Sequence, residues 1–151
     1  MSCGLALATA LLLSDPNVAL AASQPPASAS ALASVAAEPL FADIVARSGR
    51  LKSIVDGWTA SGFDAAAFSA FKPQATELAA LDMQGHLILK ERGTDGDLKC
   101  ILRGISEDLP VRVAAIEAAS SDEERAVAMS ELSHLLEDNA AVITAPPAPE
   151  V

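Results

Sequence analysis

Two histidines and a glutamate are the side chains in this sequence with the clearest potential for metal chemistry. Glu131 precedes His134 by three positions, and this Glu-x-x-His spacing places both side chains on one helix face, as in carboxylate-bridged di-metal bundles. Such sites need the pattern twice, whereas His86 has Met83 three positions before it. We therefore predict a solvated helix face at Glu131 and His134, with metal binding as an alternative.

Non-covalent haem binding is a second alternative, because a four-helix bundle can bring His86 and His134 to similar heights on two parallel helices. The sequence lacks the C-x-x-C-H motif of covalent haem attachment. Only 3% of the residues are aromatic, although a cofactor of this size needs a large apolar pocket. The main expectation is therefore that no cofactor binds.

The two cysteines of the chain are Cys3 and Cys100, which lie far apart in the sequence. If an N-terminal signal is removed, Cys3 leaves with it and Cys100 has no internal partner. A lone cysteine usually serves as a small apolar packing residue. The alternative for Cys100 is a redox-active thiol that pairs with another molecule in an oxidising compartment.

No enzyme motif is visible along the chain. The sequence contains no glycine-rich phosphate loop and no G-x-S-x-G. The run G-T-D-G-D at 93–97 lacks the alternating oxygen ligands and the closing Glu of a calcium loop, so it predicts a turn and a helix cap. An all-α enzyme whose acidic residues form no recognisable motif is kept as a further alternative.

Negative charge is concentrated in the last third of the chain. The sequence has 20 acidic and 10 basic residues, a formal net charge of −10, and ten of the acidic but only two of the basic residues follow Ser106. This imbalance argues against nucleic-acid binding, which needs clustered Lys and Arg. We predict that this acidic region is solvated surface. The alternative is an acidic face, with Glu131, Glu137 and Asp138 as its candidates, that attracts a basic protein or peptide.

The first 21 residues have the features of an export signal. The apolar run at 5–13 is too short to span a bilayer, and Ala19-Leu20-Ala21 has the small-x-small pattern of a signal-peptidase site. The first basic residue is Arg47, so we expect the true start to lie upstream and to supply the missing positive segment. These features predict a periplasmic or secreted protein without a transmembrane segment.

Two low-complexity segments flank the expected folded domain. Residues 22–38 are rich in Ala, Ser and Pro, and residues 145–151 are rich in Pro. Neither segment has enough apolar surface to offset the entropy lost on ordering. We therefore expect a disordered linker and a disordered tail around a helical domain at 39–144.

Four apolar stripes at three- and four-residue spacing divide this domain into helices. The first helix is expected at 39–61, and Ser121 followed by Glu124 predicts a capping box before the last one. Pro73 predicts a kink, or a break with a fresh helix after it. At Pro110 either the helix kinks, or Asp108 caps a second short helix.

These patterns together predict an all-α, up-down-up-down four-helix bundle with kinks near Pro73 and Pro110. Alanine, the best helix former, accounts for 32 residues. For function, we expect an exported, non-enzymatic envelope protein that binds a protein or peptide partner. A homodimer is an open alternative for the assembly, because alanine-rich helices bury little apolar surface.

Overall fold

The computed structural model describes residues 35–93 and 96–144. They form four long helices: α3 (Pro39–Ser61), α4 (Ala65–Arg92), α5 (Gly96–Ala118) and α6 (Asp122–Thr144). The described ranges contain no strand, so the all-α prediction is confirmed. The expected export signal, residues 22–34 of the expected linker and the expected tail lie outside the described residues.

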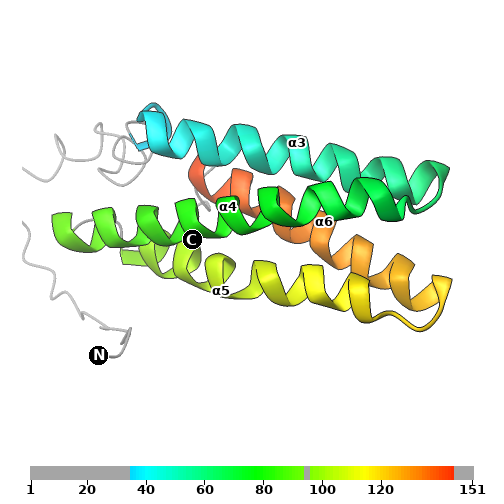
Figure 1. Cartoon of the computed structure of the whole chain (residues 1–151). Helices are drawn as coiled ribbons and strands as arrows, with labels where there is room; N and C mark the ends of the chain where they lie inside the picture. The colour runs from blue at the N-terminus through cyan, green and yellow to red at the C-terminus, as the bar shows by residue number, and fades with distance from the viewer. Residues whose placement is uncertain (1–34, 94–95, 145–151) are drawn as a thin grey trace, which may run out of the picture.

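The four helices pack side by side around one core (Figure 1). Each helix packs beside its neighbours in the sequence, and α3 also packs beside α6. Among these four helices, the diagonal pairs α3–α5 and α4–α6 are not packed neighbours. In Figure 1 the connection from α3 to α4 and the connection from α5 to α6 lie at the same end of the molecule. This packing is consistent with a four-helix bundle, and none of the four helices is long and apolar enough to cross a membrane.

Large aliphatic side chains from all four apolar stripes fill the interior, as their spacing predicts. Burying each of them contributes about 1.5–3 kcal/mol relative to leaving it in water. The largest fully buried side chains are Phe41, Phe71, Ile44, Leu78, Leu89, Leu102, Leu109, Ile116, Leu132, Leu136, Ile143 and Val55.

Most of the few aromatic residues gather where α3 connects to α4. Trp58 packs edge-on against Phe63, Phe68 and Phe71, with ring centroids 5.2 to 5.9 Å apart. The guanidinium of Arg125, from α6, lies 4.9 Å from the centroid of the Phe63 ring. This cluster closes one end of the bundle with edge-to-face and cation–π contacts.

The connection between α3 and α4 is shaped by local sequence. Gly62 follows α3 with a φ of 104°, a conformation that side chains other than glycine rarely adopt. Asp64 then caps α4, because its Oδ1 accepts hydrogen bonds from the backbone N–H groups of Ala66 and Ala67 at 2.9 and 3.0 Å. Phe63 and Phe68 pack across this cap with centroids 5.4 Å apart and form a hydrophobic staple.

The predicted capping box at the start of α6 is confirmed with one difference. Ser121 Oγ accepts a hydrogen bond from the backbone N–H of Glu124 at 3.1 Å. In return, Glu124 Oε2 accepts from the backbone N–H of Ser120 at 2.8 Å, one residue earlier than in the standard box. Both bonds satisfy donors that the helix itself leaves unpaired.

The helices continue through both prolines, so the predicted break at Pro73 and the second short helix at Pro110 are wrong. Pro73 lacks an N–H and leaves the carbonyl of Ser69 without its helical donor. Both residues are exposed, so water can bond this carbonyl, while buried Phe71 and Ala75 hold the helix to the core on either side. The kinks themselves stay predictions.

The folded domain begins four residues earlier than expected. Val35 is 4% exposed and belongs to the core. Glu38 accepts two hydrogen bonds from Arg92 at 2.7 and 2.8 Å, which ties the start of α3 to the end of α4, and these bonds lower the pKa of Glu38. Val35 therefore anchors the end of the Ala/Ser/Pro segment to the core.

Candidate functional site

An open groove of about 490 Å³ lies between α5 and α6. Its surface is formed mainly by small apolar side chains, and carboxylates lie among them. The lining residues are Ala115, Ala118, Ala119, Glu123, Glu124, Val127, Ala128 and Glu131.

Exposed valines give this groove an apolar surface, whereas the surface of a small protein normally mixes polar and apolar side chains. Val127, in the groove wall, is 60% exposed. Val111 is 61% exposed and precedes Ala115 by one helical turn on α5, so it extends the same surface along the helix. The two helices therefore present a strip of apolar surface to the solvent.

The carboxylates of the groove differ in how far they are already engaged. Glu131 binds Arg112 of α5, which also donates to Asp108 at 3.0 Å; these two bonds raise the pKa of Arg112. Glu124 is occupied by the cap of α6. Glu123 makes no hydrogen bond or ion pair with any residue the structure describes, so its charge is available to a partner.

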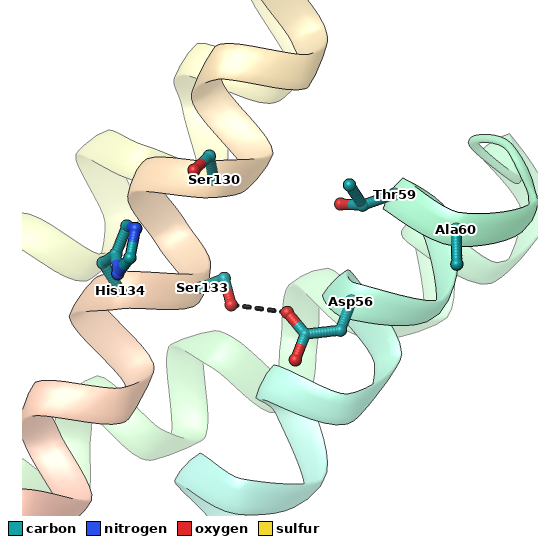
Figure 2. A pocket seen from close by; sticks show the side chains of 6 residues that line it. All are labelled: Asp56, Thr59, Ala60, Ser130, Ser133 and His134. Carbon is teal, nitrogen blue, oxygen red and sulfur yellow. Dashed lines mark hydrogen bonds between the residues drawn. The ribbon is translucent and has the colours of Figure 1, made fainter.

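A second hollow of about 330 Å³ lies between α3 and α6 and is lined by polar residues (Figure 2). Hydroxyl groups predominate, accompanied by one carboxylate and one imidazole. The lining residues are Asp56, Thr59, Ala60, Ser130, Ser133 and His134. These residue types invite comparison with a nucleophilic Ser–His–Asp site.

The geometry of this hollow does not match that chemistry. In a working triad the histidine lies between the serine and the acid. Here Ser133 Oγ donates directly to Asp56 Oδ1 at 2.5 Å, and the His134 ring does not lie between them in Figure 2. Hydrogen bonds from Lys52 and Ser133 also lower the pKa of Asp56, which makes its carboxylate a poor base.

The two histidines face different neighbours. His86 is half-buried, and its Nδ1 lies 2.7 Å from the carbonyl oxygen of Lys99 on α5, a contact that requires a proton on Nδ1. His134 is exposed on the side of α6 that faces α3. Because His86 is directed toward α5 and His134 toward the hollow beside α3, the structure does not bring the two rings to a common haem or metal site.

The two side chains of the Glu-x-x-His pattern also point toward different helices. Glu131 is directed toward Arg112 of α5, whereas His134 lines the hollow shared with α3. Within residues 35–93 and 96–144, no group of three or more His, Cys, Asp or Glu side chains is placed to hold a metal ion. The exposure of Glu131 and His134 agrees with the predicted solvated face.

The three candidates for the acidic face are divided between two sides of α6. Glu131 belongs to the α5–α6 groove, whereas Glu137 Oε2 lies 3.8 Å from Lys52 Nζ of α3. Asp138 is exposed. Only Glu131 of the three therefore contributes to the groove.

Cys100 is half-buried near the start of α5. It is disulfide-bonded. The prediction of a lone Cys100 thiol applies to a chain from which residues 1–21 have been removed, and it stays a prediction.

Two groups of residues escaped the sequence analysis. The groove residue Val127 stands outside the main apolar stripe of α6, so its exposure could have been noticed. Asp82 occupies a core position of α4 between Leu78 and Gly85, and Asn139 occupies a core position of α6 next to Leu136. In both helices the signal is a polar residue at an apolar step of the repeat.

No known protein family, curated protein or solved structure matches the chain. Its function is therefore argued from its own geometry. Of the two hollows, the α3–α6 hollow has its carboxylate already bonded on both sides. The α5–α6 groove combines unpartnered apolar surface with a carboxylate that has no partner in the described part of the chain, which makes it the candidate binding site.

Proposed function

We propose that this chain is a non-enzymatic helical module that binds a basic, amphipathic helix of a partner protein in the α5–α6 groove. The observation that carries the proposal is the groove itself, an alanine-lined hollow with Val127 exposed at its wall and three glutamates among its lining residues. A helix laid in a groove with apolar anchors on one side is a recurrent mode of peptide recognition.

The alanines favour a helical partner because short side chains let another helix approach closely. Ala115 and Ala118 lie about one turn apart on α5 and Ala119 follows the helix directly, and these short side chains leave room for larger side chains of the partner. Covering Val127 removes apolar surface from water, which stabilises the complex by about 25 cal/mol per Å² of area buried. The partner should therefore present an apolar stripe rather than a polar one.

Electrostatics favour a basic partner. Residues 107–144 contain nine acidic and two basic residues. The two basic residues are already engaged, Arg112 with Asp108 and Glu131, and Arg125 with Asp122. The field around α5 and α6 is therefore negative, and it should attract cationic segments and raise their rate of association.

We propose that the module acts after export, in the periplasm or outside the cell. Support for this comes from the apolar run at 5–13 and from Ala19-Leu20-Ala21 in the sequence. Binding in the groove does not depend on this location, so the two proposals can be tested separately.

Fluorescence anisotropy with two synthetic helical peptides tests the binding proposal. One peptide has a Leu/Ala face and a Lys/Arg face, and the other has Glu in place of Lys and Arg. We expect the basic peptide to bind the intact chain, the acidic peptide not to bind, and the affinity of the basic peptide to fall with added salt. Equal binding of both peptides would contradict the proposal.

Matched substitutions locate the binding surface. Val127→Ser removes an exposed apolar side chain from the groove, whereas Leu87→Ser removes one that is 53% exposed on α4. We expect the first to weaken binding by about tenfold, the equivalent of 1.4 kcal/mol, and the second to leave it unchanged. Glu123→Gln and Glu91→Gln form a second pair, of which only Glu123 lies in the groove.

A further inference from the structure

Each helix places one polar residue in its buried stripe. These residues are Ser48 of α3, Asp82 of α4, Ser106 of α5 and Asn139 of α6, and we call them the polar layer. Three of them have no exposed surface, and Ser106 is 7% exposed. Polar groups in a core cost stability unless hydrogen bonds replace those that water would make.

The packing register indicates that these residues lie at one level of the bundle. Gly85 of α4 lies against Ile44 of α3 and Leu102 of α5. Asp82 lies about one turn before Gly85 on α4, whereas Ser48 and Ser106 lie about one turn after Ile44 and Leu102. If α3 and α5 run antiparallel to α4, these steps all lead in the same direction, so Asp82 is level with Ser48 and Ser106. Asn139 reaches the same level from α6, because it bonds Asp82 directly.

The hydrogen bonds of the polar layer are incomplete. Asn139 Nδ2 donates to Asp82 Oδ2 at 3.0 Å, and Ser106 Oγ donates to the carbonyl oxygen of Arg103 at 2.8 Å. Three buried atoms have no partner in the described residues: Ser48 Oγ, Asp82 Oδ1 and Asn139 Oδ1. A proton on Asp82 Oδ1 would supply the donor that Asn139 Oδ1 lacks, so that the carboxyl and the carboxamide would form two reciprocal bonds.

No charged group is placed to neutralise an ionised Asp82. By this register, Ser48 of α3 and Ser106 of α5 are level with it, and Asn139 contacts it from α6. Next to Ser48 on α3, Arg47 is bound to Asp43 and Glu77; on α5, Arg103 is bound to Glu107, and Glu137 and Asp138 on α6 are exposed. On α4 itself, His86 is bonded to the carbonyl of Lys99. Burial raises the pKa of Asp82 to about 7, although the hydrogen bond from Asn139 opposes this shift.

We propose that Asp82 is a pH-sensitive latch between the diagonal helices α4 and α6. As the neutral acid, Asp82 donates from Oδ1 to Asn139 Oδ1 and accepts from Asn139 Nδ2, and this pair crosses the core between helices that do not otherwise pack together. Loss of the proton removes one of the two bonds and leaves an unpaired charge in the core, which loosens the bundle. The latch does not depend on binding in the α5–α6 groove.

Carboxyl ¹³C NMR of the intact chain tests the ionisation directly. We expect the Asp82 carboxyl to titrate near neutral pH, above the acidic range of ordinary aspartates. Amide protection factors in the globally exchanging parts of α4 and α6 should fall about tenfold from pH 6 to pH 8, as the folded state releases a proton that the unfolded state has already lost.

Asp82→Asn keeps the shape of the neutral acid and carries a donor that cannot ionise, and Asp138→Asn is the matched control. We expect the fall in protection to disappear in Asp82→Asn and to persist in Asp138→Asn. An Asp82 carboxyl that titrates in the ordinary acidic range of aspartates would overturn the latch, and so would an unchanged fall in protection in Asp82→Asn. If Asp82→Asn does not fold, the titration of the natural chain decides the question alone.

Discussion

Replacing Asp82 by Asn should change how the stability of the bundle depends on pH. Asp82 is completely buried and its pKa is raised to about 7 from an ordinary value of 3.8. Between these two values the folded protein keeps a proton that the unfolded chain releases. The contribution of Asp82 to the free energy of unfolding should therefore be largest in acid and fall as the pH rises toward 7.

The size of this effect follows from the shift. Each pH unit inside the window lowers the free energy of unfolding by about 1.4 kcal/mol, and the slope flattens near each end. From about pH 5 to about pH 7 the expected loss is about 2 kcal/mol. Asp82→Asn should abolish this contribution, because its carboxamide does not titrate, while the other ionisable groups of the chain are retained.

Urea unfolding of the natural chain and of Asp82→Asn, monitored by helical circular dichroism at several pH values, measures the difference. The informative quantity is the difference in pH dependence, since the substitution can also change stability by an amount that is constant with pH. Parallel curves for the two proteins from pH 5 to pH 7 would refute the reasoning, and so would a natural chain whose excess loss of stability occurs below pH 5.

Three further predictions concern the stability of the scaffold and are checked by the same unfolding assay. Gly104→Ala should stabilise the bundle by up to about 1 kcal/mol, because a helical alanine is favoured over glycine and nothing lies within 4 Å of its new Cβ. Gly85→Ala should lose most of that gain, because its Cβ would lie 3.2 Å from two buried side chains; an equal gain at both sites would be inconsistent with the packing. Asp64→Ala should cost about 1 kcal/mol, since it removes the side-chain cap of α4. His86→Ala should cost about 1 kcal/mol through the lost bond to Lys99, whereas exposed His134→Ala should change little; the reverse order would contradict their placement.

The fold could be predicted from the sequence because each helix carries its own local signals. These signals act within one or two turns of the residues they influence. Pro39 precedes the first apolar stripe, Asp64 follows Phe63, and Ser121 precedes Glu124. The break predicted at Pro73 does not occur. Proline disfavours a helix interior locally, but the packing of the neighbouring side chains against the core opposes this effect. The carbonyl that Pro73 frees belongs to an exposed residue, Ser69, while Phe71 and Ala75 on either side of Pro73 are buried in the core.

The candidate sites were harder to predict because they depend on contacts between helices. Glu131 and His134 share a helix face by spacing. In the structure, however, Glu131 binds Arg112 of α5, whereas His134 lines the hollow between α3 and α6. The groove needs the alanines of α5 to lie beside Val127 of α6, a proximity that spacing along one helix does not reveal. Asp82 could have been noticed in its stripe, but its bond to Asn139 crosses the bundle and needs the register of diagonal helices.

The central claim, that the α5–α6 groove binds a basic amphipathic helix, is tested most directly by mapping the basic peptide onto the ¹⁵N NMR spectrum of the intact chain. We predict shift changes centred on the groove residues of α5 and α6, including Ala115, Ala118 and Val127, and their loss in Val127→Ser but not in Leu87→Ser. Shift changes spread over all four helices, or centred on the hollow around Ser133, would contradict the claim.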